Sequence, residues 1–461
     1  MSMTARLRVS RARRETQGDA AASSRLCNAA RGALNAADTS STIAHGVIPQ
    51  TPPHHFALDI MCAETILAPL VSSPLPLALF CRPAVLLTSL IVAPIALATA
   101  IGLFNLLTWP RRLRAAAPPA AISVLIPARN EEANIEDCVR SVATAAAAHP
   151  EMQLEIIAYD DHSTDRTSHI LQTLASELPA LRLPAAKPLP VGWAGKCHAC
   201  HQLASHATHP QLLFIDADVR LLPDAFSQLA AWQKRYNADV VSAVPAQVTG
   251  SFFEHLILPL LHLTYVSWLP LLLIPHTRRA DFLAMNGQIL MTSRQAYARI
   301  GGFEAIRDAL VDDMAFGRRA KEAGLTVAFA DGTHLARCRM YRDAPSVWEG
   351  FTKNIYPGMG KNPALLLLVV ILYLSAFVLP FLLLPLSVLL PSLAPLTTPL
   401  LIAVALNLFY RTLLAIRFSH PPLSVLLHPL GVLALIAIAL NSFRQTLRGQ
   451  LTWAGRTYPN A

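Results

Sequence analysis

LLFIDAD at residues 212–218 joins four apolar residues to two carboxylates, Asp216 and Asp218. The apolar run predicts a buried β-strand, and alternate residues of an extended chain point to the same side. We therefore expect both carboxylates on one side of a sheet edge, where a divalent cation could meet a diphosphate. Acidic pairs also begin loops and cap helices, so the neighbouring sequence has to decide.

The composition indicates a membrane component. Of 461 residues, 53% are hydrophobic and only 15% are charged, against roughly 25% charged in an ordinary soluble domain. The net charge of +9 comes largely from an arginine-rich start and from positions beside apolar spans. That distribution favours anionic lipid headgroups or a diphosphate substrate over nucleic acid. The seven cysteines are odd in number and lack framework spacing, which indicates a reduced, cytosol-facing catalytic region.

The amino-terminal part divides into a tail and an apolar span. Residues 1–60 are rich in Ala, Ser and Arg without apolar periodicity, which predicts a disordered basic tail. A targeting segment or an upstream-extended start would look the same, and Met61 is an alternative start. Residues 83–108 are long enough for a transmembrane helix, for which about 20 residues suffice. Trp109 and the arginines after it place the end of this helix in the cytoplasm.

Residues 119–360 alternate short apolar runs with stretches of helix length. This alternation predicts an α/β domain with a mostly parallel sheet. The expected strands are 122–126, 155–159, 212–215, 239–243, 288–292 and 326–329. Within this region, residues 252–274 are apolar but contain Glu254 and two histidines, so we expect an interfacial or re-entrant helix rather than a full span.

Residues 363–441 return to high apolar density and predict carboxyl-terminal transmembrane helices. The candidate spans are 363–390, 399–416 and 423–440, followed by a basic tail at 442–461. One span before a cytoplasmic domain and three after it would leave that tail outside, against the preference of positive charge for the cytoplasm. Either the first candidate crosses twice or re-enters, or the tail breaks the preference, or one candidate is not a span. We expect a multi-pass inner-membrane protein with a cytoplasmic catalytic domain.

Two further strands end in polar residues that would meet at the same sheet edge. The strand at 122–126 runs into a turn containing Pro127, Arg129 and Glu131, which would face a ligand at the carboxyl edge. The strand at 155–159 is followed by Asp160 and Asp161, whose carboxylates can accept hydrogen bonds from a nucleobase and a ribose. A helix-capping loop would explain Asp165, which follows in the same stretch, but it would not explain Asp160 and Asp161.

Six motifs in order resemble one known family. IPARNEE, DDHSTDRT, GWAGK, DAD, GGF and VDD occur between residues 126 and 313. Their order and spacing resemble the inverting family 2 glycosyltransferases, over about 120–360. The resemblance implies a GT-A fold, which is a Rossmann-like nucleotide-diphospho-sugar transferase domain. The flanking spans and residues 339–354 are similar to membrane enzymes that glycosylate carotenoids or accompany hopanoid synthesis.

The resemblance gives roles to the donor-side residues. Asp160 and Asp161 would hold the nucleoside of a UDP- or GDP-sugar, and Lys196 would meet its ribose or phosphates. Asp216 and Asp218 would bind Mg²⁺ or Mn²⁺, hard cations that prefer oxygen ligands and offset charge on a departing diphosphate.

Asp313 occupies the position of the family's catalytic base. It would take a proton from the acceptor hydroxyl while the anomeric carbon is attacked from the face opposite the leaving group. Acids also favour the first turn of a helix, which is the alternative explanation for the pair Asp312 and Asp313.

One departure from the family bears on the product. Processive polysaccharide synthases carry a Gln-x-x-Arg-Trp motif after the base, and this chain has no such string. Lys353 lies in the corresponding region and would supply a cation near the diphosphate. Its ammonium is a single point of charge, whereas the guanidinium of an arginine can bind two oxygens at once. This favours transfer of a single sugar to a lipid-like acceptor, such as a carotenoid, a hopanoid or another polyprenyl-derived alcohol.

Two other functions stay open at this level. One is a sugar transferase that acts on polyprenyl phosphate. The other is a membrane transporter whose soluble region only binds nucleotide. The carboxyl-terminal spans hold few ionisable groups, chiefly Arg411 and His428, which disfavours transport.

Overall fold

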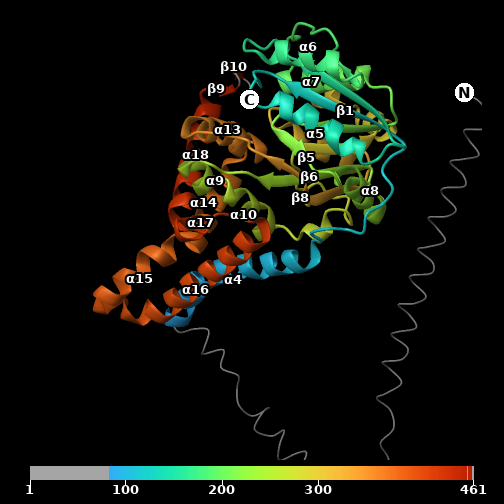
Figure 1. The fold of residues 1–461 in the computed structure, drawn as a ribbon. Helices are drawn as coiled ribbons and strands as arrows, with labels where there is room; N and C mark the ends of the chain where they lie inside the picture. Colours follow the sequence, from blue (N-terminus) through green and yellow to red (C-terminus); the bar gives the residue numbers. More distant parts are fainter. Residues whose placement is uncertain (1–82, 454, 459–461) are drawn as a thin grey trace, which may run out of the picture. The chain divides into compact units, whose positions relative to one another are not determined.

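The computed structural model describes residues 83–453 and 455–458, with side chains from residue 88 onward. The tail expected at 1–60 and the alternative start at Met61 lie outside the described residues. The described part combines an α/β domain with a group of apolar helices (Figure 1).

The α/β domain is built on an eight-stranded sheet with the order β3-β2-β1-β4-β7-β6-β8-β5. Its strands are β1 Ala121–Ala128, β2 Gln153–Asp160, β3 Leu181–Arg182, β4 Gln211–Ile215, β5 Val219–Leu221, β6 Val240–Gln247, β7 Ile289–Ser293 and β8 Val327–Cys338. Each predicted strand overlaps an observed one. Among the described strands of this sheet, β7 is antiparallel to both neighbours and β5 is antiparallel to β8, so the sheet is mixed although most of its pairs are parallel.

The register of the central strands decides where the functional groups meet. β1 pairs in parallel with β2, ending at Ala128 opposite Asp160, and in parallel with β4 on its other side. The carboxyl ends of these three strands therefore open at one edge of the sheet. β1 and β4 are almost wholly apolar and buried, and both run into polar residues at that edge.

Helices cover the sheet, and two of them present their first turns at the same edge, at Lys196 and at Asp312. They are α5 Ile135–Ala147, α6 Thr167–Glu177, α7 Gly195–His206, α8 Ala225–Tyr236, α11 Arg294–Ile300, η2 Phe303–Ile306, α12 Asp312–Glu322 and α13 Ala344–Gly358. α7 packs on β1 and β2, and α8 packs on β8.

Three described helices are long and apolar enough to cross a membrane, namely Thr88–Thr108, Pro391–Phe418 and His428–Leu447. The apolar group consists of α4 Pro83–Thr108, α14 Pro363–Phe377, α15 Leu379–Leu389, η3 Pro391–Leu396, α16 Thr397–Phe418, α17 Leu423–Leu426 and α18 His428–Leu447. The candidate span at 363–390 is thus two helices that break at Val378. Pro380 in the first turn of α15 explains the break, because a proline has no N–H to continue the helix and fits best at a helix start.

Residues 252–274 form three short helical segments rather than the single expected helix. They are α9 Phe252–Ile257, α10 Pro259–Trp268 and η1 Leu271–Leu273. Pro259 opens α10, and Pro270 separates α10 from η1. α10 packs against α4 and α16, so this segment joins the sheet domain to the apolar helices.

Buried polar contacts tie α4 and α16 to the sheet domain. The Asn105 side-chain amide donates to the carbonyls of Val266 and Leu269, each at 2.7 Å. The Trp109 indole donates to the carbonyl of Phe329 at 2.8 Å. At the end of α16, Arg417 pairs with the fully buried Asp331 at 2.6 Å.

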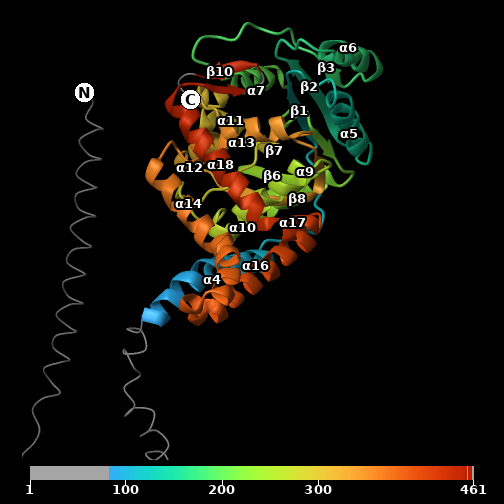
Figure 2. The same ribbon diagram turned by 90° about the vertical axis from the view of Figure 1, so that its left-hand side faces the viewer.

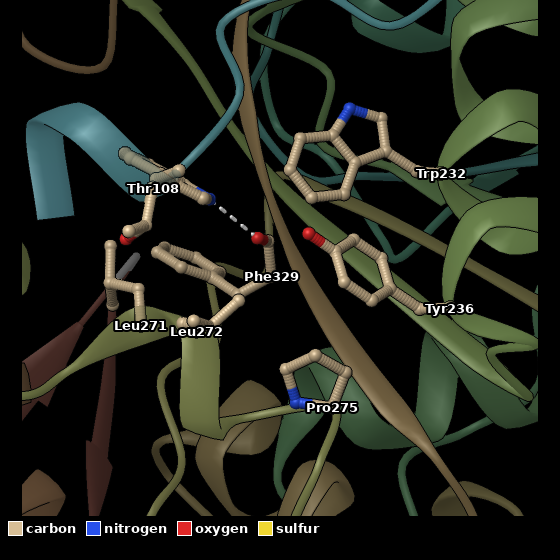
Figure 3. Close-up of a pocket in the computed structure, with 8 residues that line it drawn as sticks. Thr108, Trp232, Tyr236, Leu271, Leu272, Pro275 and Phe329 are labelled. Carbon is tan, nitrogen blue, oxygen red and sulfur yellow. Dashed lines mark hydrogen bonds between the residues drawn. The ribbon is translucent and has the colours of Figure 1, made fainter.

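A small pocket lies beside this junction (Figure 3). Its labelled lining residues are Thr108, Trp232, Tyr236, Leu271, Leu272, Pro275 and Phe329. No residue expected to bind donor or metal lines it, so it is separate from the site described below.

α18 runs alongside α13 and α9 of the catalytic region (Figures 1 and 2). Near its start, Gly431 has no room for a side chain because the carbonyl oxygen of Leu256 lies 2.7 Å from the position a Cβ would take. After Leu447 the chain forms an antiparallel ribbon of β9 Leu451–Trp453 and β10 Arg456–Tyr458. The region 442–461, expected as a basic tail, therefore contains the end of α18 and a ribbon that contacts the sheet domain through Arg456.

Candidate active site

The carboxyl edge of the sheet gathers the acidic residues singled out in the sequence. Asp216 and Asp218 follow β4, Asp160 ends β2 and Asp161 follows it. Asp313 joins them from the first turn of α12.

Lys196 connects two of these groups. Its ammonium, in the first turn of α7, lies 2.7 Å from an oxygen of Asp216 and 3.6 Å from an oxygen of Asp312. Burial acts to lower the pKa of Lys196, but the two carboxylates outweigh it and raise the pKa well above its usual range. Lys196 is therefore charged and links the end of β4 to the start of α12. The family resemblance implies that Lys196 contacts the donor, and the sequence does not predict the ion pair between Lys196 and Asp312.

The carboxylate of Asp313 is held in a fixed orientation. One oxygen accepts a hydrogen bond from the Gly287 N–H at 2.9 Å, and the other accepts from the Met314 N–H at 2.7 Å. Burial and then the neighbouring Asp312 raise the pKa of Asp313 to about 6. A Cβ on Gly287 would lie 3.3 Å from Asp313 and 3.4 Å from the Lys196 ammonium. The glycine at this turn therefore allows the backbone to approach the cluster closely.

Asp218 carries an unsatisfied oxygen. Its Oδ1 is buried and has no hydrogen-bond partner within the described residues. Burial and then Asp216 raise the pKa of Asp218 to about 6. A buried acceptor without a donor is costly, so this oxygen is suited to a ligand.

Glu131 belongs to the same acidic group. Burial and then Asp218 raise the pKa of Glu131 to about 7. Its carboxylate also accepts a hydrogen bond from the Asn134 amide at 2.8 Å. The sequence placed Glu131 in a turn that faces the donor, whereas its charged neighbours are the two aspartates after β4.

Pro127 and Arg129, which the sequence places in the same turn as Glu131, lie in different positions. Pro127 lies within β1, where it pairs with Tyr159 of β2. Arg129 donates to the backbone carbonyls of Asp161 at 2.6 Å and His162 at 3.2 Å. Arg129 thus braces the loop after β2.

The two carboxylates at the end of β2 have different partners. Asp160 accepts a hydrogen bond from the Ser163 N–H at 3.0 Å. Both oxygens of the buried Asp161 are held by the guanidinium of Arg456, at 2.5 and 3.1 Å. No motif marked Arg456, because it lies 295 residues further along the chain in a stretch read as a tail.

Lys353 on α13 completes the cationic side of the site. Its ammonium lies 4.9 Å from the centre of the Trp453 ring. Burial lowers the pKa of Lys353, while the charges of Asp312, Asp216 and Asp313 oppose that shift. α13 therefore brings Lys353 into electrostatic range of the acidic cluster.

Comparison with known protein families identifies the class. The model of glycosyl transferase family 2 matches residues 123–297, and that of glycosyl transferase family group 2 matches residues 212–416. The mixed α/β sheet is of the GT-A type, with its acidic residues at the carboxyl edge. The two models together match residues 123–416, and this region is a family 2 glycosyltransferase domain.

The curated relatives that match this chain carry the name of one particular enzyme. A 4,4'-diaponeurosporenoate glycosyltransferase of Staphylococcus aureus (strain USA300) is 27% identical over 350 residues, which span 73% of this chain and 88% of the relative. The enzyme of the same name from strain MRSA252 is 26% identical over 259 residues, covering 55% of this chain and 66% of the relative.

Solved structures give more distant matches. A mannosyltransferase, PcManGT from Pyrobaculum calidifontis in complex with GDP-Man and Mn²⁺, aligns with a TM-score of 0.46 and 16% identity, over 78% of this chain and 99% of that one. A fragment of S. aureus TarS in complex with UDP aligns with a TM-score of 0.33 and 18% identity, over 51% of this chain and 65% of that one.

Proposed function

We propose that this glycosyltransferase moves a single sugar from a UDP- or GDP-sugar to a lipid-like acceptor, with inversion at the anomeric carbon. The acceptor would be a carotenoid, a hopanoid or another polyprenyl-derived alcohol. The observation that carries the proposal is the cluster in which Lys196 joins Asp216 to Asp312, directly beside the oriented carboxylate of Asp313. The relatives named for a carotenoid substrate support the acceptor class.

Asp313 would act as the general base. Its carboxylate is fixed by two backbone N–H groups, and a pKa of about 6 leaves it deprotonated at neutral pH but basic enough to accept a proton. It would take the proton of the acceptor hydroxyl as that oxygen attacks the sugar. An acceptor that is already a carboxylate would need no such base, which makes the role testable.

The residues after β4 fit a divalent cation. Asp216 and Asp218 provide carboxylate oxygens, and the buried Oδ1 of Asp218 lacks any partner among the described residues. Among all the residues that the structure describes, no group of three or more His, Cys, Asp or Glu side chains is arranged to hold a metal ion. Two carboxylates with the remaining ligands from phosphates and water suit Mg²⁺, and also Mn²⁺. When bound, the cation would offset negative charge on the departing nucleoside diphosphate.

Lys196 would have to share Asp216 with that cation. Its ammonium now lies on the Asp216 carboxylate, and the partner oxygen of Asp312 is 3.6 Å away. With a cation on Asp216, Lys196 would keep Asp312 and turn its remaining donors toward the donor phosphates. This would reconcile the observed ion pair with the phosphate contact that the family resemblance implies.

We infer that a lipid acceptor would approach Asp313 along α10. Burial and then the negative charge of the nearby Asp313 raise the pKa of the Tyr265 phenol. The same helix bonds to the apolar helices, through Thr264 to Tyr373 at 3.0 Å and through Ser267 to Tyr410 at 2.9 Å. A hydroxyl entering from the lipid side would therefore meet Asp313 after passing one helix.

The arrangement of α18 also suggests a membrane topology. Both ends of α18 contact the catalytic region, at Gly431 and through the ribbon that follows it. If α18 lies along the membrane surface, then α4, the α14–α15 pair and α16 make three crossings. The basic carboxyl end would then lie on the same side as the catalytic domain, in agreement with the positive-inside preference.

A donor and acceptor screen tests the proposed function. The purified full-length protein, with Mn²⁺ or Mg²⁺, would be given UDP- and GDP-sugars with carotenoid, hopanoid and polyprenyl phosphate acceptors. The expected product is an alcohol-type lipid carrying one sugar. Transfer only to the phosphorylated acceptor would replace this proposal with a polyprenyl-phosphate transferase, and the absence of any transfer would contradict both.

A further inference from the structure

The carboxyl-terminal ribbon β9–β10 reaches the nucleoside end of the site. The guanidinium of Arg456 forms a fork with both oxygens of Asp161, and the side chains are 19% and 5% exposed. The phenol of Tyr458 accepts a hydrogen bond from the N–H of Gly195, at the start of α7. The ribbon therefore contacts both segments that the family resemblance assigns to nucleoside and ribose.

The other strand of the ribbon is fixed beside Lys353. Trp453 receives the Lys353 ammonium on its ring and lies 6.5 Å from the ring of Tyr341. Leu451 is almost completely buried, and β9 packs on α13. β9 is therefore anchored, whereas the main polar attachments of β10 are the contacts of Arg456 and Tyr458.

Arg456 holds both oxygens of Asp161, and the Asp161 side chain is only 5% exposed, so little of the carboxylate is accessible to a nucleoside. One of its oxygens also lies 3.4 Å from the His162 ring. A nucleoside that uses Asp161 must therefore displace the guanidinium. Arg456 stays charged after displacement, because a guanidinium is not deprotonated in proteins. It then needs another anion.

A donor diphosphate would be that anion. The proposed divalent cation and Lys196 would supply part of the positive charge, while Lys353 is stacked on Trp453. The carboxylates of the site still repel a diphosphate, so a further positive charge facing it would strengthen binding. A planar guanidinium binds two phosphate oxygens at once, so Arg456 suits this role better than either lysine.

We propose that Arg456 is a donor-binding residue that rests on Asp161 until the nucleotide sugar arrives. The nucleoside takes over Asp161, and the guanidinium transfers to the phosphate oxygens of the donor. This inference rests on the proposed use of a nucleotide-sugar donor. It extends the donor site to a ribbon outside the family motifs.

Binding of UDP and GDP, compared with uridine and guanosine, tests the exchange in the full-length protein. Arg456→Gln should weaken binding of the preferred nucleoside diphosphate about tenfold or more, because a charge-assisted fork to phosphate is lost. Binding of the corresponding nucleoside should not weaken, because the variant frees Asp161. Arg456→Lys should give an intermediate loss for the diphosphate. Arg448→Gln, which removes the same charge from an exposed position nearby, is the matched control and should leave both affinities unchanged.

The outcomes separate this inference from the proposed function. If wild type binds nucleoside diphosphate and Arg456→Gln binds it equally or more tightly, Arg456 only blocks the site and the inference is wrong. An equal loss for nucleoside and diphosphate would indicate damage to the pocket and would also contradict it. If neither nucleotide binds the wild type, the donor proposal itself fails. Thermal unfolding of each variant checks that the fold is retained.

Discussion

Replacing Asp313 with asparagine removes the base while keeping the size of the side chain. In the wild type, the two carboxylate oxygens accept hydrogen bonds from the N–H groups of Gly287 and Met314. Asparagine keeps one acceptor and turns an NH₂ group toward the other N–H. Asp312 cannot take over the role, because its carboxylate faces the Lys196 ammonium. We therefore expect the loss typical of a missing general base, about 10² to 10⁴-fold in kcat, or roughly 3 to 5 kcal/mol.

The pH dependence of the transfer rate gives a second quantitative prediction for Asp313. The base works when deprotonated, so activity is present above its pKa and is lost as pH falls through it. With a pKa of about 6, about 99% of Asp313 is deprotonated at pH 8 and about 10% at pH 5. The wild-type rate should fall about tenfold over that range, and the residual rate of Asp313→Asn should lack this dependence.

The assay is sugar transfer at saturating donor and acceptor, with the fold checked by thermal unfolding. Asp281→Asn is the matched control, because Asp281 is 75% exposed and pairs only with Arg279 among the described residues. If Asp313→Asn transferred sugar within threefold of wild type on a hydroxyl acceptor, the assignment of the base would be wrong.

Three further predictions concern the cation, the junction and the topology. Asp218→Asn should raise the Mn²⁺ concentration needed for half-maximal activity about tenfold or more, because one charged oxygen ligand is lost; an unchanged metal titration would remove Asp218 from the site. Asp331→Asn should lower the unfolding temperature in detergent markedly, since it leaves the partly buried Arg417 without its counter-charge, at a cost of up to about 3 to 5 kcal/mol. Asp224→Asn breaks the exposed pair with Arg112 and should cost under about 1 kcal/mol; equal shifts for the two variants would contradict the proposed importance of the junction. A reporter fused after α18 should be active only in its cytoplasmic form, and an external signal would show that α18 crosses the membrane.

The sequence predicted the sheet well because its strands are strongly apolar. β1 and β4 are buried along nearly their whole length, and such runs between polar segments indicate strands without tertiary information. The antiparallel insertion of β7 between β4 and β6 was not predicted, because strand direction depends on a connection that passes through α10 and η1. The two-residue β3 and three-residue β5 are too short to give a periodic signal.

The acidic residues of the site were predicted from motifs, and their partners were not. Asp216, Asp218 and Asp313 stand directly after a strand or at a helix start, where sequence pattern and position coincide. The pairing of Lys196 with Asp312 depends on how α7 and α12 approach each other, and nothing local to either helix specifies it. The sequence around Arg456 predicts only a basic tail, because the stretch is short and polar, although its partner Asp161 is a candidate site residue.

The most direct test of the proposed reaction is the structure of its lipid product. Mass spectrometry of the product counts the sugars on each acceptor, and nuclear magnetic resonance gives the configuration of the new glycosidic bond. We predict one sugar per lipid, an anomeric configuration opposite to that of the donor, and loss of the product when the divalent cation is chelated. A polymer on the lipid, or a sugar that keeps the donor's configuration, would contradict the proposal of a single inverting transfer with Asp313 as the base.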